Sequence, residues 1–278
     1  IIMGFFNNKK DNGKEVAKGN SSFDLEALTS GLDIDNIGML SGSDLGDLKN
    51  SNEAELDAAI KSFSKRQVDV MFVFDRSGSC AGTELDMMRG FNNFIKHEKD
   101  ERNEDFITVS LFDHENKVVY DRTPVKRVKG LEYQVRGNTA LYDSLCENLK
   151  SLQRKKDDNT EVIVVIMTDG ADNSSHEYDI DKTRGLISGL KRQGWNFIFL
   201  GAMDYAKDYA AELGIDEKYA EIYSPEAVDA NFKAIERVAD DVHGSGKVSE
   251  DWAEPVVEAR LQIEGRKDSH VKRLGRRK

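Results

Sequence analysis

The sequence predicts an α/β fold, in which a mostly parallel central sheet carries helices on both faces and one antiparallel strand at its edge. From residue 68 onward, short apolar runs alternate with amphipathic segments, the pattern of strands followed by helices. Two runs, 68–75 and 162–168, are almost continuously apolar, as strands buried on both faces are. Two further strands, 106–112 and 118–123, flank a short polar turn, so they are expected to form a hairpin that supplies the antiparallel strand.

The remaining elements follow from apolar spacing and from turn residues. Leu85, Met88, Phe91 and Ile95 lie at helical spacing, so these four side chains are expected in the core. Strands are also expected at 195–200 and 220–223, and helices at 84–99, 140–155, 180–193, 205–213 and 227–242.

The chain divides into three parts by composition. Residues 1–66 are polar and are expected to form a flexible extension with a short helix at 53–64, although their apolar islands leave docking on a partner open. Residues 67–246 are expected to form the domain. Residues 247–278 are expected to form a helix, spanning 252–263, and a basic tail.

Charge and cysteine content exclude several classes of protein. Residues 264–278 carry a net charge of +5, whereas the rest of the chain carries −16. The acidic body disfavours nonspecific nucleic-acid binding, which leaves only the tail as a candidate nucleic-acid contact. Two cysteines, Cys80 and Cys146, are too few for a disulfide scaffold or a zinc site. The low cysteine count makes a reducing cytoplasm the expected location. No run approaches the roughly 18 apolar residues of a membrane span.

Oxygen-bearing side chains gather where the buried strands end. Asp75 ends the first strand, and Ser77 and Ser79 follow it at alternate positions. Asp169 follows the strand at 162–168, and Thr139 stands at the start of a helix after a glycine-bearing loop. Parallel strands of one sheet end at the same edge, where open α/β sheets bind ligands. Carboxylates and hydroxyls form an all-oxygen set suited to a hard divalent cation, Mg²⁺ first.

This combination resembles the von Willebrand factor A domain with its metal-ion-dependent adhesion site. The Asp-x-Ser-x-Ser motif of that family matches Asp75, Ser77 and Ser79, its later threonine matches Thr139, and its later Asp-Gly matches Asp169. The resemblance covers about residues 68–246, and the run around Thr139 is similar to intracellular bacterial members. It implies a Rossmann-like, three-layer fold.

The resemblance also implies a function. The two serines and the threonine would contact Mg²⁺, with Mn²⁺ or Ca²⁺ as alternatives, while the aspartates act through water. An open coordination position would then attract a Glu or Asp from a partner protein. The chain is therefore expected to be a non-enzymatic adhesion or scaffold module, in a bacterial stress-response system or beside an ATPase.

Other interpretations of the same residues remain open. The serines and Thr139 could serve only as helix caps, and Asp169 only as a turn former. A metal-dependent hydrolase could use the same cation, with His176 or a carboxylate as base. Arg76 is expected to point to solvent. Three polar residues near the rim are expected to have structural roles: Asp143, Asp172 and Asn173.

Overall fold

The structure, a computed structural model, describes residues 67–101 and 104–275, with side chains as far as Lys267. These residues belong to one compact unit of the chain, Ser64–Lys278. The expected extension at 1–66, with its helix at 53–64, lies outside the described residues.

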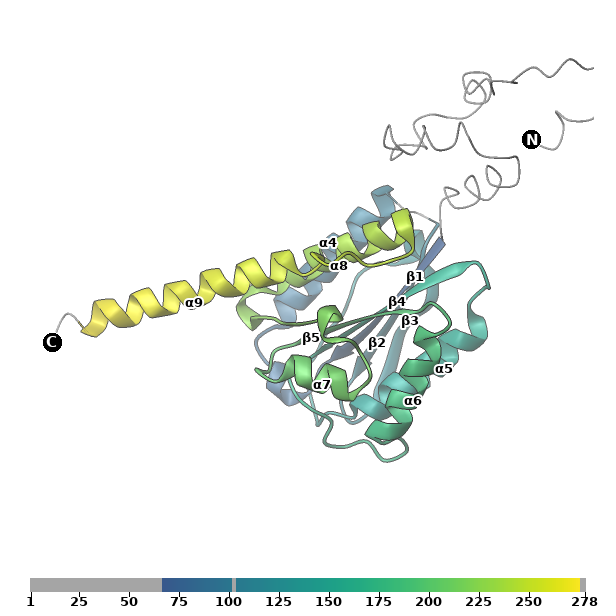
Figure 1. The fold of residues 1–278 in the computed structure, drawn as a ribbon, viewed down its shortest axis with the longest axis horizontal. Coiled ribbons are helices and arrows are strands. Elements are labelled where there is room, and N and C mark those ends of the chain that lie inside the picture. Colours follow the sequence, from purple (N-terminus) through teal and green to yellow (C-terminus); the bar gives the residue numbers. More distant parts are fainter. Residues whose placement is uncertain (1–66, 102–103, 276–278) are drawn as a thin grey trace, which may run out of the picture. The chain divides into compact units, whose positions relative to one another are not determined.

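A six-stranded sheet with the strand order β3-β2-β1-β4-β5-β6 forms the centre of the described unit (Figure 1). The pair β2–β3 is antiparallel, and the other neighbours in the sheet run parallel. The strands are β1 (Gln67–Asp75), β2 (Phe106–Phe112), β3 (Asn116–Pro124), β4 (Thr160–Thr168), β5 (Asn196–Gly201) and β6 (Ala220–Ile222). The predicted fold class is therefore confirmed, including the antiparallel edge strand.

The described residues also form six α-helices. They are α4 (Glu84–Glu101), α5 (Leu141–Lys155), α6 (Ile180–Lys191), α7 (Ala206–Glu212), α8 (Val228–Ser245) and α9 (Glu254–Gly275). Short 3-10 turns occur at Gly78–Cys80, Val125–Arg127, Glu217–Tyr219 and Pro225–Ala227. Each helix lies close to its predicted position, with ends that differ by one to three residues in most cases.

The strand order places a topological switch point beside β1. The chain leaves β1 through α4 and reaches β2 on one side, whereas β4 pairs with β1 on the other side. The register between the two parallel strands sets Phe74 opposite Met167, so β1 and β4 end at the same level. Open α/β sheets bind ligands in the crevice at such a point, outside the carboxyl ends of the strands.

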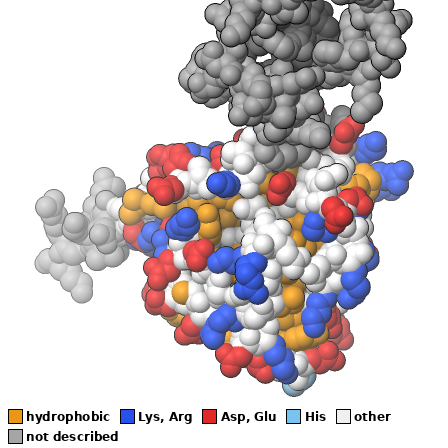
Figure 2. All heavy atoms as spheres, turned by 45° about the vertical axis from the view of Figure 1, so that its right-hand side comes forward, with side chains coloured by type: hydrophobic (Ala, Val, Ile, Leu, Met, Phe, Trp, Pro, Cys, Tyr) orange, Lys and Arg blue, Asp and Glu red, His pale blue; other side chains and the backbone are white. Residues whose placement is uncertain are grey.

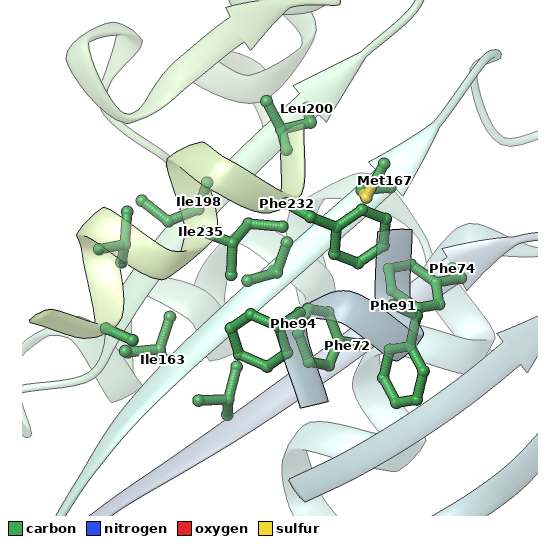
Figure 3. Close-up of a cluster of buried hydrophobic side chains, with 14 of the residues drawn as sticks. Phe72, Phe74, Phe91, Phe94, Ile163, Met167, Ile198, Leu200, Phe232 and Ile235 are labelled. Carbon is green, nitrogen blue, oxygen red and sulfur yellow. The ribbon is translucent and has the colours of Figure 1, made fainter. Parts of the chain in front are cut away.

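Two apolar layers fill the space between the sheet and its helices. Alternate side chains of β1 point to opposite faces, so Phe72 packs toward α4 and α8, whereas Val73 packs toward α5 and α6. The ring of Phe72 lies 5.6 Å from that of Phe91 and 5.2 Å from that of Phe94, both nearly perpendicular to it (Figure 3). Edge-to-face packing of this kind stabilises aromatic clusters beyond simple burial.

The expected core stripe of α4 is partly wrong. Phe91 and Ile95 are buried as predicted, but the Leu85 side chain is 76% exposed. The buried stripe begins at Met87 and continues through Phe91, Phe94 and Ile95. Two residues along a helix turn the side chain by about 200°, so Leu85 faces away from a stripe that begins at Met87.

Helix α9 is longer than predicted and covers part of the β6 edge. The prediction ended the helix at residue 263, whereas α9 continues to Gly275. Its attachment begins at Trp252, which is buried and donates from Nε1 to the Lys218 carbonyl (2.8 Å). Ion pairs from Arg260 to Glu221 and from Lys267 to Glu226 extend the contact to β6 and to the turn before α8.

The described helices include none with the length and apolar content needed to cross a bilayer. On the face shown in Figure 2, acidic and basic side chains are mixed, with smaller groups of apolar side chains between them.

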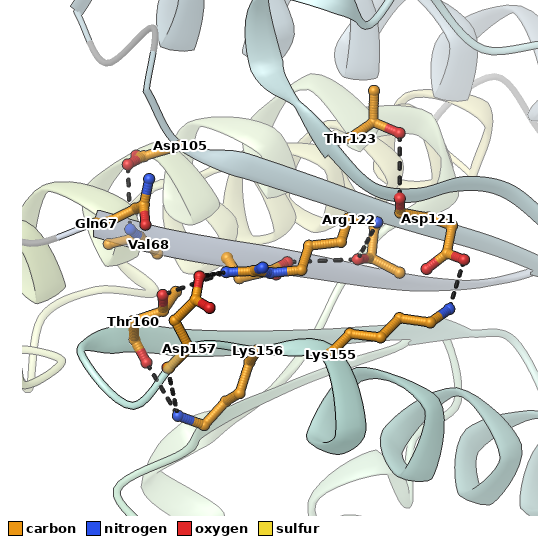
Figure 4. A network of polar contacts seen from close by, with 12 residues as sticks. Gln67, Val68, Asp105, Asp121, Arg122, Thr123, Lys155, Lys156, Asp157 and Thr160 are labelled. Atoms are coloured by element: carbon orange, nitrogen blue, oxygen red, sulfur yellow. Dashed lines mark hydrogen bonds and ion pairs between the residues drawn. The ribbon is translucent and has the colours of Figure 1, made fainter.

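A polar network links the strands at the opposite end of the sheet from the switch point (Figure 4). Arg122 of β3 contacts Asp69 of β1 (3.2 Å) and Asp157 before β4 (2.6 Å), and its guanidinium lies over the Phe106 ring. Asp69 is fully buried, and burial raises the pKa of its carboxyl to about 6, although the Arg122 charge opposes that rise.

A prediction follows from the tight contact between α4 and α8. A Cβ atom added at Gly90 would lie 2.2 Å from the Phe232 ring, so Gly90→Ala should destabilise the chain by about 1–3 kcal/mol through overpacking. Gly185 in α6 has no atom within 4 Å of such a Cβ, and Gly185→Ala should stabilise the chain by up to about 1 kcal/mol. Urea unfolding of both variants measures the difference. Equal effects of the two substitutions would contradict the close packing of α4 on α8.

A second prediction concerns pH. The folded-state pKa of Asp69, about 6, lies above its ordinary value of 3.8, so the folded chain binds this proton more tightly than the unfolded chain does. The resulting stabilisation is present below about pH 4 and is lost as the pH rises through about 6. Between pH 4 and pH 7, the unfolding free energy of wild type should therefore fall by about 2–3 kcal/mol relative to that of Asp69→Asn. A difference that stays constant across this range would count against the raised pKa.

Candidate metal centre

Three loops meet at the carboxyl end of β1. The first follows β1 and contains Ser77 and Ser79, the second is the loop at 136–140, and the third follows β4 at Asp169. The first two are joined by backbone hydrogen bonds, from Gly78 N–H to the Gly137 carbonyl (3.1 Å) and from Arg136 N–H to the Arg76 carbonyl (2.8 Å).

A chain of hydrogen-bonded oxygens connects the first loop to the third. The Ser77 and Ser79 hydroxyls lie 3.1 Å apart, and the Ser79 hydroxyl donates to Asp169 Oδ1 (2.8 Å). Ser77 is buried, whereas Ser79 is exposed and Asp169 is partly exposed. The oxygens therefore extend from the interior to the surface of the protein at the carboxyl end of β1.

Asp75 lies at the base of this chain and orients it. Its Oδ1 accepts a hydrogen bond from Ser77 N–H (2.7 Å), and its Oδ2 accepts one from the Thr168 hydroxyl (2.6 Å). Burial raises the pKa of the Asp75 carboxyl above its ordinary value, and the nearby charge of Asp169 raises it further. Because both oxygens already accept hydrogen bonds, Asp75 is suited to hold the serine loop and to contact a cation through water.

Thr139 is buried in the second loop, which the third loop holds in place. Its N–H donates to Asn173 Oδ1 (2.9 Å), and its carbonyl accepts hydrogen bonds from Asn173 N–H (2.9 Å) and Ser174 N–H (3.2 Å). Within the described residues, the Thr139 hydroxyl makes no hydrogen bond. The five predicted residues thus stand on three loops that contact one another directly.

The capping alternatives for Ser77 and Thr139 do not fit the local geometry. The residue that caps α5 is Ala140, not Thr139, and it provides no side-chain capping bond. Ser77 precedes the 3-10 turn Gly78–Cys80 but also makes no side-chain capping bond there. The Ser77 and Thr139 hydroxyls are therefore not needed to complete helix ends.

The donor chemistry fits a hard divalent cation. The candidate ligands are three hydroxyls and two carboxylates, all oxygen, and Mg²⁺, Mn²⁺ and Ca²⁺ prefer such ligands. Ser77, Ser79 and Thr139 would hold the ion directly, with Asp75 and Asp169 on its outer side. Three atoms lie within 4.8 Å of one another: a carboxylate oxygen of Asp75, a carboxylate oxygen of Asp169 and the Cys80 sulfur.

Several residues of the site were not predicted from the sequence. The Thr168 hydroxyl donates a hydrogen bond to the Asp75 carboxylate, and the Tyr133 hydroxyl donates one to the backbone carbonyl of Asp75. The Cys80 thiol contacts the same carbonyl at 3.5 Å, and burial raises the pKa of Cys80 well above its ordinary value. Thr168 is the last residue of β4, the strand that pairs with β1. That position is the one feature of the sequence that could have identified Thr168 as a neighbour of Asp75.

The rim residues have structural roles, as predicted. The Asp143 carboxylate accepts backbone hydrogen bonds from three consecutive residues, 176–178, at 2.7–3.0 Å. Asp172 accepts from Tyr142 N–H (3.1 Å), and Asn173 accepts from Thr139 N–H. His176 is exposed in this loop.

The prediction for Arg76 is wrong. Its side chain is buried rather than directed to solvent, and its Nε lies 2.9 Å from Oδ2 of Asp113, which is itself fully buried. The physical reason is the carboxylate at the end of β2, which compensates the guanidinium charge inside the protein.

Comparison with known proteins supports the fold. No family model matches the chain, and no curated protein matches it. Among solved structures, the vWF domain of the type V pili tip protein Mfa5 from Porphyromonas gingivalis is similar, with a TM-score of 0.51 and 12% identity. That match covers 67% of this chain and 99% of the Mfa5 domain.

Two further structures are similar at lower scores. A mutant of the PilB minor pilin from Streptococcus sanguinis has a TM-score of 0.47 and 16% identity, over 64% of this chain and 63% of the pilin. The manganese-loaded TRAP protein of Plasmodium vivax has a TM-score of 0.44 and 15% identity, over 60% of this chain and 72% of TRAP. The fold and the Mfa5 likeness together define a protein with a von Willebrand factor A-type fold.

Gly137 provides a prediction about the second loop. Its φ of +69° lies in the left-handed region, and a Cβ atom there would lie 2.1 Å from His114 Nδ1. Gly137→Ala should therefore displace the loop and weaken cation binding by about tenfold. Gly194→Ala serves as the control, because Gly194 also has a positive φ but lies before β5, at the other end of the sheet. Titration with Mn²⁺ measures both affinities, and an unchanged affinity in Gly137→Ala would refute the role of this loop.

Proposed function

We propose that this chain is a cation-dependent protein-binding module that captures an acidic residue of a partner protein. The observation that carries the proposal is the hydrogen-bonded arrangement at the switch point of the sheet. Asp75 accepts from the Ser77 N–H, the Ser77 and Ser79 hydroxyls lie 3.1 Å apart, and the Ser79 hydroxyl donates to Asp169. Thr139 completes the set from the neighbouring loop.

The ligand types explain how such a site would bind a partner. Hydroxyl ligands are neutral, so a cation held by Ser77, Ser79 and Thr139 keeps much of its positive charge. Mg²⁺ prefers six oxygen ligands, and the positions not filled by protein would hold water or an incoming carboxylate. A Glu or Asp of a partner would provide a negative charge and a further oxygen ligand. The bound cation would attract that carboxylate, and the residues of this chain would hold the cation in position.

The same geometry favours a binding role over catalysis. The Cys80 thiol beside the site has a raised pKa, which disfavours the reactive thiolate. The Asp75 carboxylate already accepts two hydrogen bonds, and His176 is exposed on a loop held by Asp143. We therefore propose a non-enzymatic module with Mg²⁺ as its cation and Mn²⁺ or Ca²⁺ as substitutes. A cytoplasmic location and a bacterial stress-response or ATPase-partner system stay predictions.

The proposal predicts that Asp75→Ala abolishes stabilisation by Mg²⁺. For wild type, Mg²⁺ at a concentration 100-fold above its Kd should raise the unfolding free energy by about 2.7 kcal/mol. Ser79→Ala, at an exposed position, should lose most of this effect without disturbing the core. Asp158→Ala, which removes an exposed carboxylate just before β4, should keep it. Thermal unfolding with and without Mg²⁺ measures all four proteins.

Partner capture provides the second half of this test. Wild type and Asp158→Ala should retain a partner from lysate in Mg²⁺ and release it in chelator, whereas Asp75→Ala and Ser79→Ala should retain none. Capture that persists unchanged in chelator would overturn the proposal.

A further inference from the structure

The residue after β2 joins the first two loops of the candidate site. Asp113 is fully buried, and its Oδ2 lies 2.9 Å from Arg76 Nε and 2.8 Å from Arg136 Nε. The first contact is an ion pair without an aligned hydrogen bond, whereas the second is a hydrogen bond donated by Arg136. We refer to Arg76, Asp113 and Arg136 as the Asp113 cluster.

Backbone hydrogen bonds join the same three segments. Arg76 N–H donates to the Phe112 carbonyl (2.8 Å), and Ala140 N–H donates to the Asp113 carbonyl (2.7 Å). Arg136 N–H donates in turn to the Arg76 carbonyl (2.8 Å). The end of β2, the serine loop and the Thr139 loop are thus held in one arrangement by both main chain and side chains.

The turn after β2 also has its own support. Asp113 Oδ1 accepts a hydrogen bond from Glu115 N–H (2.8 Å), and His114 Nδ1 lies 3.1 Å from the same oxygen. The Arg136 guanidinium contacts Glu115 as well as Asp113. Both Asp113 oxygens therefore have partners, and the carboxylate has little freedom to rotate.

The position of each charge matters for a cation. Arg76 stands between Asp75 and Ser77 in the sequence, so its buried guanidinium places a positive charge on the first loop of the candidate site. Like charges at short range in a poorly solvated region repel each other strongly. The Asp113 carboxylate offsets the Arg76 charge, and through Arg136 it also holds the loop that contains Thr139.

We propose that Asp113 is a positioning residue for the candidate cation site, although it is not one of the ligands. It holds the Thr139 loop through Arg136 and neutralises Arg76 beside the serine loop. This inference rests on the proposed function, because it concerns the affinity of the same site.

The test uses Arg136→Gln in the full chain, because Arg136 is half exposed and its loss leaves the buried Arg76–Asp113 pair intact. Mn²⁺ alone is the probe, titrated by calorimetry. Arg136→Gln should weaken Mn²⁺ binding by about tenfold while the melting temperature of the metal-free protein changes little. Arg154→Gln, which removes the same charge from an exposed position of α5, should bind Mn²⁺ as wild type does.

Asp113→Asn should have a larger effect, about 10-fold to 100-fold, because it also leaves Arg76 uncompensated. Arg136→Lys, which keeps the charge, should recover part of the affinity lost in Arg136→Gln. Equal affinities for wild type and Arg136→Gln, or an equal loss in Arg154→Gln, would overturn the proposal.

Amide hydrogen exchange of the metal-free chain separates this inference from the proposed function. Arg136→Gln should raise the exchange rate of the Ala140 amide, which donates to Asp113, and leave that of Val165 in β4 unchanged. Wild type that binds no Mn²⁺ would defeat the proposed function. An exchange rate of the Ala140 amide that is the same in Arg136→Gln as in wild type would refute the positioning role of Asp113.

Discussion

The parallel pairing of β1 with β4 is the constraint on which the rest of the site depends. These two strands lie on either side of the switch point and end at the same level, so Asp75 and the residues after Thr168 lie at the same edge of the sheet. The pairing is enforced from both faces, because side chains such as Phe72 and Val73 are fully buried in separate apolar layers. A one-residue slip would exchange these faces and move every polar residue at the strand ends. The strongly buried sheet therefore fixes the polar loops that follow it.

Burial near the strand ends also sets the electrostatics of the candidate site. Asp75, Arg76 and Asp113 are all buried, and each has a partner that compensates it: Thr168 and the serine loop for Asp75, and the ion pair for the other two. Ser77 and Thr139 are also buried, and their hydroxyls are neutral. This arrangement gathers neutral hydroxyl donors next to the carboxylates of Asp75 and Asp169, whose negative charges would attract a cation.

Much of the fold, and the gathering of the candidate site residues at one edge of the sheet, could be predicted from the sequence, because both depend on local patterns. The apolar runs at 68–75 and 162–168 indicate buried parallel strands, and parallel strands of one sheet must deliver Asp75 and Asp169 to the same edge. The serine spacing after Asp75 places both hydroxyls on the same turn. These inferences need only periodicity and the topology of an α/β sheet.

The errors concern contacts between residues far apart in the sequence. Arg76 is buried because Asp113, 37 positions later, lies beside it, and neither residue has a local pattern that reveals the pair. Leu85 has the spacing of a core residue, but the stripe that α4 buries is set by its packing on Phe72 and Phe232. The contacts of α9 with Glu221 and Glu226 likewise join segments far apart in the sequence, and the composition of the tail does not indicate them.

The most direct measurement of the central claim is the position of the ion itself. A crystal of the chain grown with Mn²⁺ should show an anomalous peak in the crevice between β1 and β4, with the Ser77, Ser79 and Thr139 hydroxyls as ligands at about 2.0–2.3 Å, close to the distances of Mg²⁺ sites. At least one further coordination position should hold water or a carboxylate from outside the chain. Full Mn²⁺ occupancy elsewhere, with these three hydroxyls making no contact to an ion, would contradict the account.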